Sequence, residues 1–211
     1  MLPSAALENA APGLVTGTGT QGLSGDGNGD GILDSVQQQV VSTEFVQSSN
    51  PSGNANAAKT FITLVADSSA GKVADTNSSV QLTQISQKDA PANLPAGINM
   101  PLGLIAFTAN IAQSGAAETF SLYVTDNALG INGYWKQSAT GVWTNLASAA
   151  HGGAIVQEGG KLRLDFSIAD GGEFDADGQA NGVIVDPGAI GSMPLSLVGY
   201  APDLPTGGFW F

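Results

Sequence analysis

Apolar and polar residues alternate along much of the chain, in short runs separated by turn residues. Apolar residues occupy every second position at 120–124 and again at 162–168, which is the period of a strand with one buried face. Similar runs predict strands at 61–65, 80–85 and 102–111, a hairpin of 134–137 with 142–146, and a last strand at 195–200. Because these short strands occur with almost no helical periodicity, we predict an all-β fold, an antiparallel β-sandwich of jelly-roll or immunoglobulin-like type.

The first 24 residues carry no sustained periodicity. They are rich in Ala, Gly, Thr and Ser with scattered Pro, which is typical of a linker. We therefore predict a linker at 1–24 and a single domain at 25–211, because 211 residues fit one β-sandwich of ordinary size. The N-terminus lacks the basic and apolar regions of a signal peptide. We expect an export signal elsewhere in a longer protein, of which this chain is a monomeric module.

Composition narrows the classes of partner. Six basic residues against eighteen acidic ones give a net charge of −12, and no Lys or Arg cluster offers a groove for phosphates, so nucleic acid is not expected. No apolar run approaches the roughly 18 residues of a membrane helix, so we expect no membrane insertion. The absence of cysteine excludes disulfides, thiolate-bound zinc and a cysteine nucleophile. Such an acidic chain repels itself when compact unless cations bind, which makes calcium dependence the natural hypothesis.

A calcium-binding pattern is present at 26–37, DGNGDGILDSVQ. Side-chain oxygens at loop positions 1, 3, 5 and 9 and a backbone carbonyl at position 7 match an EF-hand-type loop, with a glycine at position 6 for the sharp turn. The matching ligands are Asp26, Asn28, Asp30, Asp34 and, through its carbonyl, Ile32. At position 12, Gln37 replaces the bidentate Glu, so we expect a weaker site or one completed by a carboxylate from elsewhere. The alternative is a glycine-rich turn that binds no ion.

A short helix is expected directly after this loop. Asp34 or Ser35 suits its N-terminus, and Val36, Val40 and Val41 would lie on its inner side. The fold prediction is therefore a β-sandwich with a short helix after an N-terminal EF-hand-like calcium loop.

A second acidic stretch, 170–188, places carboxylates and amides among glycines. Its candidate calcium ligands are Asp170, Glu173, Asp175, Asp177, Gln179, Asn181 and Asp186. Carboxylates this close in sequence repel one another unless something neutralises them, and hard oxygen donors on a backbone free to curl suit Ca²⁺. The ion would be purely structural or would keep an open position for a partner's carboxylate. A solvated acidic loop without metal is the alternative.

Aromatic residues on the predicted hairpin form the candidate ligand surface. We expect Tyr134, Trp135 and Trp143 to lie beside Asp175 and Asp177, because rigid rings next to acidic loops suit contact with a peptide or a sugar. The alternative is that these rings belong to the core or cover the end of the sandwich.

Catalysis has little support in the sequence. His151 is the one histidine and has no evident Ser partner for a catalytic triad. Carboxylates are numerous, but nothing singles out an acid and a base for glycoside hydrolysis. We therefore expect that the protein is not an enzyme.

Three blocks of the chain stand out, in the order DGNGDGILDSVQQQV, MPLGLIAFTANI and GGAIVQEGGKLRLDFSIADGGEFDADGQANGVIVDPGAIG. A Tyr/Trp-rich hairpin, GYWKQSATGVWTNLA, lies between the second and the third. Together they resemble the choice-of-anchor U domain of bacterial surface proteins over roughly 26–191, most specifically at 174–188, FDADGQANGVIVDPG. The resemblance implies a module near the end of a large exported protein, and thus an extracellular location on the bacterial cell surface.

In size, acidity and lack of cysteine the chain is also similar, more loosely, to the calcium-dependent peptide-binding domains of RTX adhesins, which act in cell adhesion and biofilms. This similarity implies an extracellular module that uses Ca²⁺ to bind a peptide or protein C-terminus on a host or neighbouring cell. Two alternatives remain open at this point. One is a structural, calcium-braced stalk module without another ligand, and the other is a calcium-dependent carbohydrate-binding domain that takes a glycan.

Overall fold

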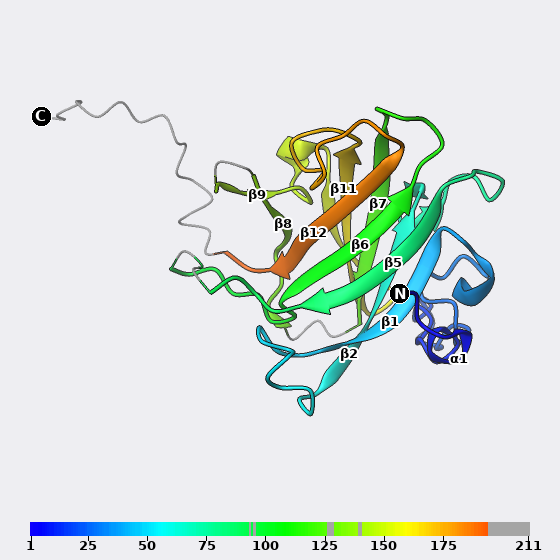
Figure 1. Ribbon diagram of the computed structural model, residues 1–211. Helices are drawn as coiled ribbons and strands as arrows, with labels where there is room; N and C mark the ends of the chain where they lie inside the picture. The colour runs from blue at the N-terminus through cyan, green and yellow to red at the C-terminus, as the bar shows by residue number, and fades with distance from the viewer. Residues whose placement is uncertain (93, 95, 126–128, 139–140, 194–211) are drawn as a thin grey trace, which may run out of the picture.

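The computed structural model describes residues 1–92, 94, 96–125, 129–138 and 141–193, and consists mainly of two five-stranded antiparallel sheets packed face to face (Figure 1). The predicted all-β, antiparallel β-sandwich is confirmed. The strand expected at 195–200 lies outside the described residues. No helix in the described part of the chain is long and apolar enough to cross a membrane.

Each sheet combines strands from distant parts of the sequence. The first sheet contains, in spatial order, β1 (Val40–Val46), β2 (Lys59–Ala66), β7 (Ala117–Val124), β11 (Lys161–Ala169) and β10 (Ala154–Glu158). The second sheet contains β5 (Gln81–Lys88), β6 (Leu104–Asn110), β12 (Val183–Gly191), β8 (Gly133–Gln137) and β9 (Trp143–Asn145). The short elements are β3 (Ser68–Ser69) paired with β4 (Lys72–Val73), helix α1 (Ala5–Glu8), and the 3₁₀ turns η1 (Asp34–Val36) and η3 (Ala149–His151).

The core lies between the two sheets. On the first sheet Leu64 pairs with Leu122, and Leu122 pairs with Leu164, so three fully buried leucines cross the sheet in one row. Ile105 and Ile184, on the second sheet, belong to the same apolar cluster. This arrangement follows from the period-2 pattern, because alternate side chains of a strand point to opposite faces of its sheet.

An aromatic series also crosses the core. The ring centroids are 5.0 Å apart for Phe107 and Phe120, 5.5 Å for Phe120 and Phe166, and 3.9 Å for Phe166 and Tyr134. The first and the last of these rings come from the second sheet, and the two between them come from the first. The series therefore links both layers of the sandwich.

A glutamine side chain links the edge strands β1 and β5 of the two sheets. Gln87 of β5 accepts a hydrogen bond from the Val46 backbone N–H (2.9 Å) and donates to the Val46 carbonyl (2.7 Å). The same Nε2 donates to the Leu102 carbonyl (2.9 Å). Near the start of β5, the Leu82 N–H donates to the carbonyl of Gln38, just before β1, at 2.9 Å. Edge strands β1 and β5 thus satisfy part of each other's backbone, and less of the β1 edge is left free to pair with another chain.

The N-terminal segment packs on the domain, so the predicted linker at 1–24 is wrong. Ala11 is fully buried and its carbonyl accepts from the Gly25 N–H at 2.7 Å. The Val15 N–H donates to the Gly159 carbonyl at 2.8 Å, next to the β10–β11 turn. This segment and the loop after it cover the outer face of the first sheet, where Val40, Val65 and Tyr123 are buried.

The short helix expected after the 26–37 loop begins at Asp34 but is only the 3₁₀ turn η1, and the expected placement of Val40 and Val41 on it is wrong. The chain forms a single 3₁₀ turn and continues as strand β1. Val40 pairs with Val65 and Val41 with Leu64, and both valines are buried, whereas Val36 is 72% exposed. The strand is favoured because β-branched side chains lose little freedom on a sheet, and here they pack on both of its faces.

Candidate metal centres

The 26–37 loop lies against the outer face of the first sheet, and Gly27 is its point of closest approach. A Cβ at Gly27 would overlap the hydroxyls of Ser42 and Thr63 and the carboxylate of Asp34. Those two hydroxyls hydrogen-bond to each other across β1 and β2 at 2.6 Å. A residue without a side chain is therefore needed where the loop meets the sheet.

Three of the predicted ligands curl toward one another. Asp26 accepts hydrogen bonds from the backbone N–H groups of Asp30 (3.0 Å) and Gly31 (2.9 Å). The Asn28 amide donates to Asp30 Oδ2 at 3.1 Å. Asn28 is fully buried and Asp26 nearly so. These hydrogen bonds hold the side chains of positions 1, 3 and 5 close to one another.

Position 12 brings a fourth oxygen to the loop. Gln37 Nε2 donates to Asp30 Oδ2 at 2.8 Å, while Gln37 Oε1 is buried and has no hydrogen-bond partner. An unpaired buried acceptor costs about 1–3 kcal/mol. The Gln37 amide lies beside the Asp30 carboxylate, and its unpaired oxygen with the side-chain oxygens of Asp26, Asn28 and Asp30 is a set of hard ligands of the kind that suits Ca²⁺.

Asp34 was expected as a ligand at position 9, but its carboxylate turns toward the sheet. Its oxygens accept from the Gly27 N–H (2.9 and 3.1 Å) and from Ser42 Oγ (2.5 Å). The side chain is fully buried, and this burial raises its pKa to about 7 against the lowering effect of the two hydrogen bonds. Asp34 thus anchors the loop to the sheet.

Ile32, the position 7 residue, is 40% exposed and donates its N–H to Asp30 Oδ1 at 2.9 Å.

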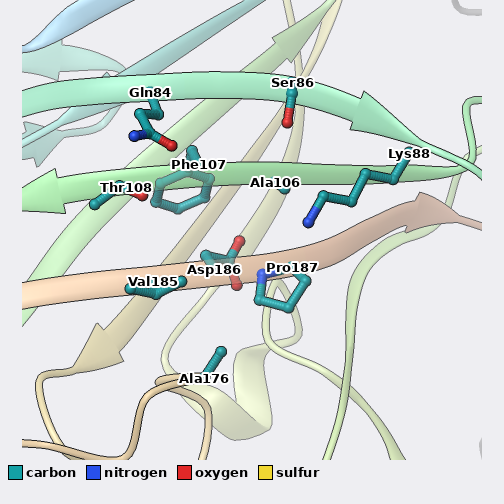
Figure 2. Close-up of a pocket in the computed structure, with 10 residues that line it drawn as sticks. All are labelled: Gln84, Ser86, Lys88, Ala106, Phe107, Thr108, Ala176, Val185, Asp186 and Pro187. Atoms are coloured by element: carbon teal, nitrogen blue, oxygen red, sulfur yellow. The ribbon is translucent and has the colours of Figure 1, made fainter. Parts of the chain in front are cut away.

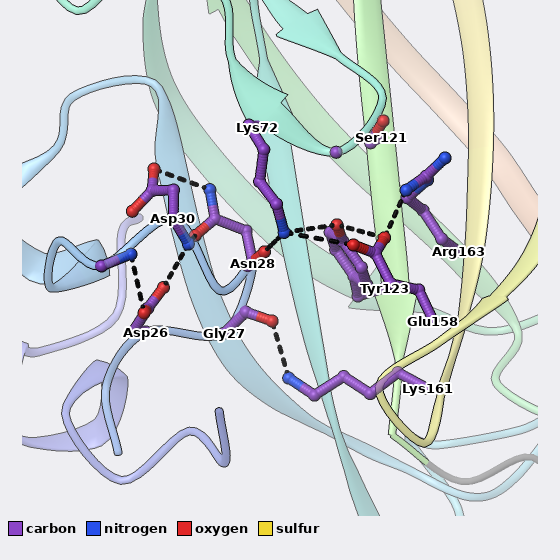
Figure 3. A network of polar contacts seen from close by, with 12 residues as sticks. Asp26, Gly27, Asn28, Asp30, Lys72, Ser121, Tyr123, Glu158, Lys161 and Arg163 are labelled. Atoms are coloured by element: carbon purple, nitrogen blue, oxygen red, sulfur yellow. Dashed lines mark hydrogen bonds and ion pairs between the residues drawn. The ribbon is translucent and has the colours of Figure 1, made fainter. Parts of the chain in front are cut away.

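Two lysines reach the carbonyls of the same loop (Figure 3). Lys161 Nζ donates to the carbonyls of Gly27 (2.7 Å) and Pro12 (2.5 Å), and Lys72 Nζ donates to the carbonyl of Asn28. Burial lowers the pKa of Lys161 to about 8, although Asp34 and Asp26 oppose the shift. These ammonium groups offset part of the loop's negative charge and tie it to β4 and β11.

Behind Lys72, a polar network continues across the first sheet. Lys72 Nζ is 3.3 Å from Glu158, whose carboxylate also pairs with Arg163 and accepts from Tyr123 Oη at 3.0 Å. Burial alone would raise the pKa of Glu158, but Lys72, Tyr123 and Arg163 together lower it. Figure 3 shows these groups in a continuous line from the loop to Arg163. The network was not predicted, because its members are far apart in sequence.

The second acidic loop is closed by its own backbone. Asp170 accepts from the N–H groups of Gly115 (2.7 Å), Gly182 (2.8 Å) and Asn181 (3.3 Å). These bonds, that of Gly115 first, lower the pKa of Asp170. Asp175 accepts from the N–H groups of Gly171 and Val185, both at 2.9 Å. The two most buried carboxylates of the loop therefore act as acceptors for its own chain.

The remaining polar residues of this loop face outward or bond locally. Asp177 accepts from the Gln179 N–H (2.9 Å) and from the Asn181 amide (3.0 Å). Glu173, Gln179 and Asn181 are exposed. Unlike the 26–37 loop, this stretch holds no orphaned buried oxygen among its described residues.

Asp186, the last predicted ligand of this stretch, is separated from the acidic loop. It lies on β12 with its side chain fully buried in the sandwich. Its two oxygens bond to Lys136 Nζ and Tyr134 Oη. Its placement as a calcium ligand is therefore corrected, because both oxygens are committed to partners on β8.

The expected aromatic surface is largely buried as well. The hairpin forms as predicted, with Trp135 opposite Asn145. Tyr134 is fully buried in the core and Trp135 is 4% exposed, packed with Met100 and Ala189. Trp143 packs on the same small cluster from a half-buried position. These rings stabilise the second sheet and leave little surface for a ligand.

No group of three or more His, Cys, Asp or Glu side chains within the described residues is placed to hold a metal ion. The set in the 26–37 loop differs from such a group because two of its four donors, Asn28 and Gln37, are amides. His151 is exposed on η3.

A groove of about 400 Å³ crosses the outer face of the second sheet (Figure 2). Its lining comprises Gln84, Ser86, Lys88, Ala106, Phe107, Thr108, Ala176, Val185, Asp186 and Pro187. Figure 2 shows Lys88 reaching from β5 over β6 toward Pro187. Ala176, from the second acidic loop, closes the other side. Nothing in the sequence singled out this groove, because its lining residues come from three strands and a loop.

Comparisons of the chain with protein-family models, with curated proteins and with solved structures gave no match. The function is therefore argued from the geometry of the loops and the groove.

Proposed function

We propose that the chain is a calcium-braced β-sandwich module of an extracellular surface protein. The observation that carries the proposal is the buried, unpartnered Oε1 of Gln37 beside Asp30. Ca²⁺ takes six to eight oxygen ligands, and a bound ion would give this oxygen a partner.

Four residues would hold the ion: Asp26, Asn28, Asp30 and Gln37. Bound calcium would supply positive charge and fix the positions of these oxygens. The loop touches the first sheet through Gly27, and its neighbours from α1 onward pack on the same face. The ion would therefore brace the N-terminal segment on the sandwich.

The composition of the loop also suggests where the module works. With a neutral amide at position 12, the site carries fewer negative ligands than a complete EF-hand loop. Calcium affinity falls as the number of negatively charged ligands falls. Extracellular calcium modules bind in the range of about 10⁻⁴–10⁻³ M. A net charge of −12 is best tolerated where divalent cations are abundant.

A melting experiment tests this proposal. Wild type and the Asp30→Asn variant would be heated with millimolar CaCl₂ and with EDTA, and calorimetric titration would measure calcium binding. We expect calcium to raise the wild-type melting temperature and to do so less for Asp30→Asn. The control is Asp177→Asn, which removes the same charge from the other loop and should respond like wild type. Equal wild-type melting temperatures with calcium and EDTA would refute the proposal.

A second function, recognition of a peptide C-terminus, is favoured by the groove on the second sheet. Lys88 is exposed over it and forms no ion pair with any described residue. A free ammonium above an apolar floor that includes Ala106 and Pro187 suits a peptide carboxylate, whose last side chain would lie on that floor.

Immobilised peptides with free C-termini, the same peptides amidated, and a glycan array would test the groove, each with calcium and with EDTA. We expect binding to free C-termini that weakens on amidation and in Lys88→Ala. Lys59→Ala is the matched control, since Lys59 is a surface lysine paired with Glu44 away from the groove. Loss of binding in EDTA would place calcium in the contact. Binding to glycans alone, or to none of the arrays, would rule out the peptide function.

A further inference from the structure

Three polar side chains meet inside the apolar sandwich. Lys136 is 2% exposed, and Asp186 and Tyr134 are fully buried. Lys136 and Tyr134 lie on one face of β8, and Asp186 lies on the neighbouring strand β12. In the β8–β12 register Ala189 pairs with Trp135, so one further step places Lys136 opposite Gly188, two residues from Asp186 on the same face. This diagonal is within reach of a lysine side chain.

The contacts within this group are direct. Lys136 Nζ bonds Asp186 Oδ1, and Tyr134 Oη donates a hydrogen bond to Asp186 Oδ2. The tyrosine ring reaches this position because Gly188 has no side chain, since a Cβ there would overlap the phenol. Phe166 stacks on the other side of the ring at 3.9 Å between centroids and 12° between planes.

The surroundings are apolar. Ile184 and Ile190 flank Asp186 along the inner face of β12 and are fully buried in the main core cluster, together with Phe166. Two charges removed from water this completely carry a desolvation penalty that their attraction offsets only in part. Burial, with the nearby charge of Asp175 adding to the effect, raises the pKa of Asp186 against the lowering effect of Lys136 and Tyr134. Transfer of one proton from the ammonium to the carboxylate gives a neutral amine beside a neutral carboxylic acid and leaves no isolated charge.

From this geometry we infer that Lys136 and Asp186 join in an intramolecular amide bond, which links β8 to β12 covalently. The neutral Nζ attacks Cγ of the protonated Asp186 carboxyl group, forming the N–C bond and a tetrahedral intermediate. The nitrogen loses a proton, one carboxyl oxygen takes it and departs, and the products are the amide and one water molecule. The reaction is a condensation without change of oxidation state, so it needs no oxidant, reductant or cofactor.

Tyr134 touches the reacting carboxyl group and is the catalytic residue of this step. Its hydroxyl donates to the oxygen on which negative charge develops as the amine attacks. Burial raises the pKa of the phenol, with Asp186 adding to the effect, so it remains a proton donor. The apolar walls strengthen this hydrogen bond and disfavour return of the water that would hydrolyse the product.

The bond would join residues that are 50 positions apart in the chain. It would link β8 covalently to its neighbour β12 in the second sheet. The link would not depend on calcium or on redox conditions. A cysteine-free chain would gain by this route the kind of cross-link that a disulfide provides elsewhere.

Intact-mass spectrometry of the purified, denatured full chain tests the inference. We expect a mass lower than that of the sequence by about 18 Da, one water molecule. In a tryptic digest, cleavage after Lys136 should be blocked, and a branched product should connect the segment containing Lys136 to the segment containing Asp186. A wild-type mass equal to that of the sequence, with the two residues in separate linear peptides, would overturn the inference.

Variants distinguish this bond from other reactions that remove one water molecule from the chain. Asp–Gly pairs such as Asp26–Gly27 and Asp170–Gly171 lose the same mass on cyclising to a succinimide. That loss would persist in Lys136→Arg, and hydroxylamine would convert the succinimide to a hydroxamate or cleave the chain there, whereas the inferred loss should be absent from Lys136→Arg and resist hydroxylamine. Lys59→Arg, at an exposed ion pair, is the matched control and should retain the loss.

Tyr134→Phe tests the catalytic role. It keeps the stacked ring and removes only the hydroxyl, and we expect a larger fraction of uncross-linked chain with an unchanged circular dichroism spectrum. A fully cross-linked Tyr134→Phe chain would remove Tyr134 from the mechanism. Persistence of the mass loss in Lys136→Arg would overturn the bond itself, whether or not that variant folds.

Discussion

Gln37 Nε2 donates a hydrogen bond to Asp30 Oδ2 over 2.8 Å, and Oε1 of the same amide is buried without a partner. Gln37 occupies the twelfth position of the 26–37 loop, and the two ends of its amide have different surroundings. One group bonds a carboxylate of the loop, and the other is left with no donor. In the proposed calcium site, the ligand at position 12 would therefore be neutral.

The first prediction follows from this neutral ligand. Gln37→Glu supplies a bidentate carboxylate at position 12 and should increase calcium affinity roughly tenfold, because affinity in these loops depends on ligand charge. Isothermal titration with CaCl₂ measures the change. Gln38→Glu adds the same charge at the next position, an exposed side chain bonded to the Ser78 carbonyl, and should leave the affinity nearly unchanged. Equal gains in the two variants would indicate a general charge effect.

A second prediction concerns pH. Burial raises the folded-state pKa of Asp34 from 3.8 to about 7, so between these values the folded chain holds a proton that the unfolded chain has released. This contribution to stability is complete below about pH 4 and is lost as pH rises toward 7. Urea unfolding in EDTA should show the wild type losing roughly 2–4 kcal/mol relative to Asp34→Asn over this interval. Parallel pH profiles would show that Asp34 ionises normally in the folded chain.

The close approach of the loop to the sheet gives a third prediction. In Gly27→Ala the new methyl group would overlap the Ser42 and Thr63 hydroxyls, so the loop must shift away from the first sheet. We expect a loss of about 1–3 kcal/mol in urea unfolding. Gly17→Ala is the matched control, because nothing lies within 4 Å of a Cβ there. An equal loss in both variants would point to chain flexibility in place of the contact.

A fourth prediction concerns the sheet edge closed by Gln87. Gln87→Ala leaves the Val46 N–H without this partner, while the Val46 carbonyl keeps its bond from the Ser48 N–H, and an unsatisfied group costs about 1–3 kcal/mol if it stays buried. The variant should unfold at lower urea concentration and, with β1 exposed, should associate more in light scattering. Gln81→Ala, at an exposed position of the same strand, should do neither. A stable monomeric Gln87→Ala chain would contradict the role of the amide.

The strands predicted from short apolar runs between turn residues formed as β2, β5, β6 and the β8–β9 hairpin, and those predicted from uninterrupted alternation formed as β7 and β11. β7 and β11 carry apolar side chains at every second position, and both formed where expected. β12 was not predicted, because Asp186, Pro187 and Gly188 resemble part of an acidic turn when read locally. Inside the fold they form a strand, since Asp186 finds Lys136 and Gly188 makes room for Tyr134.

The candidate sites divide in the same way. The oxygens of Asp26, Asn28 and Asp30 are gathered by hydrogen bonds that span at most five residues, so the sequence by itself determined this part of the loop. The direction of Asp34 depends on Ser42 in β1, and that of Asp186 depends on Lys136, 50 residues away. The sequence thus determined the alternating strands and the local arrangement of Asp26, Asn28 and Asp30 in the first loop. Tertiary structure decided which carboxylates remain in the loops and which are buried in the sandwich, because a buried charge must lie beside a partner and strand pairing alone brings those partners together.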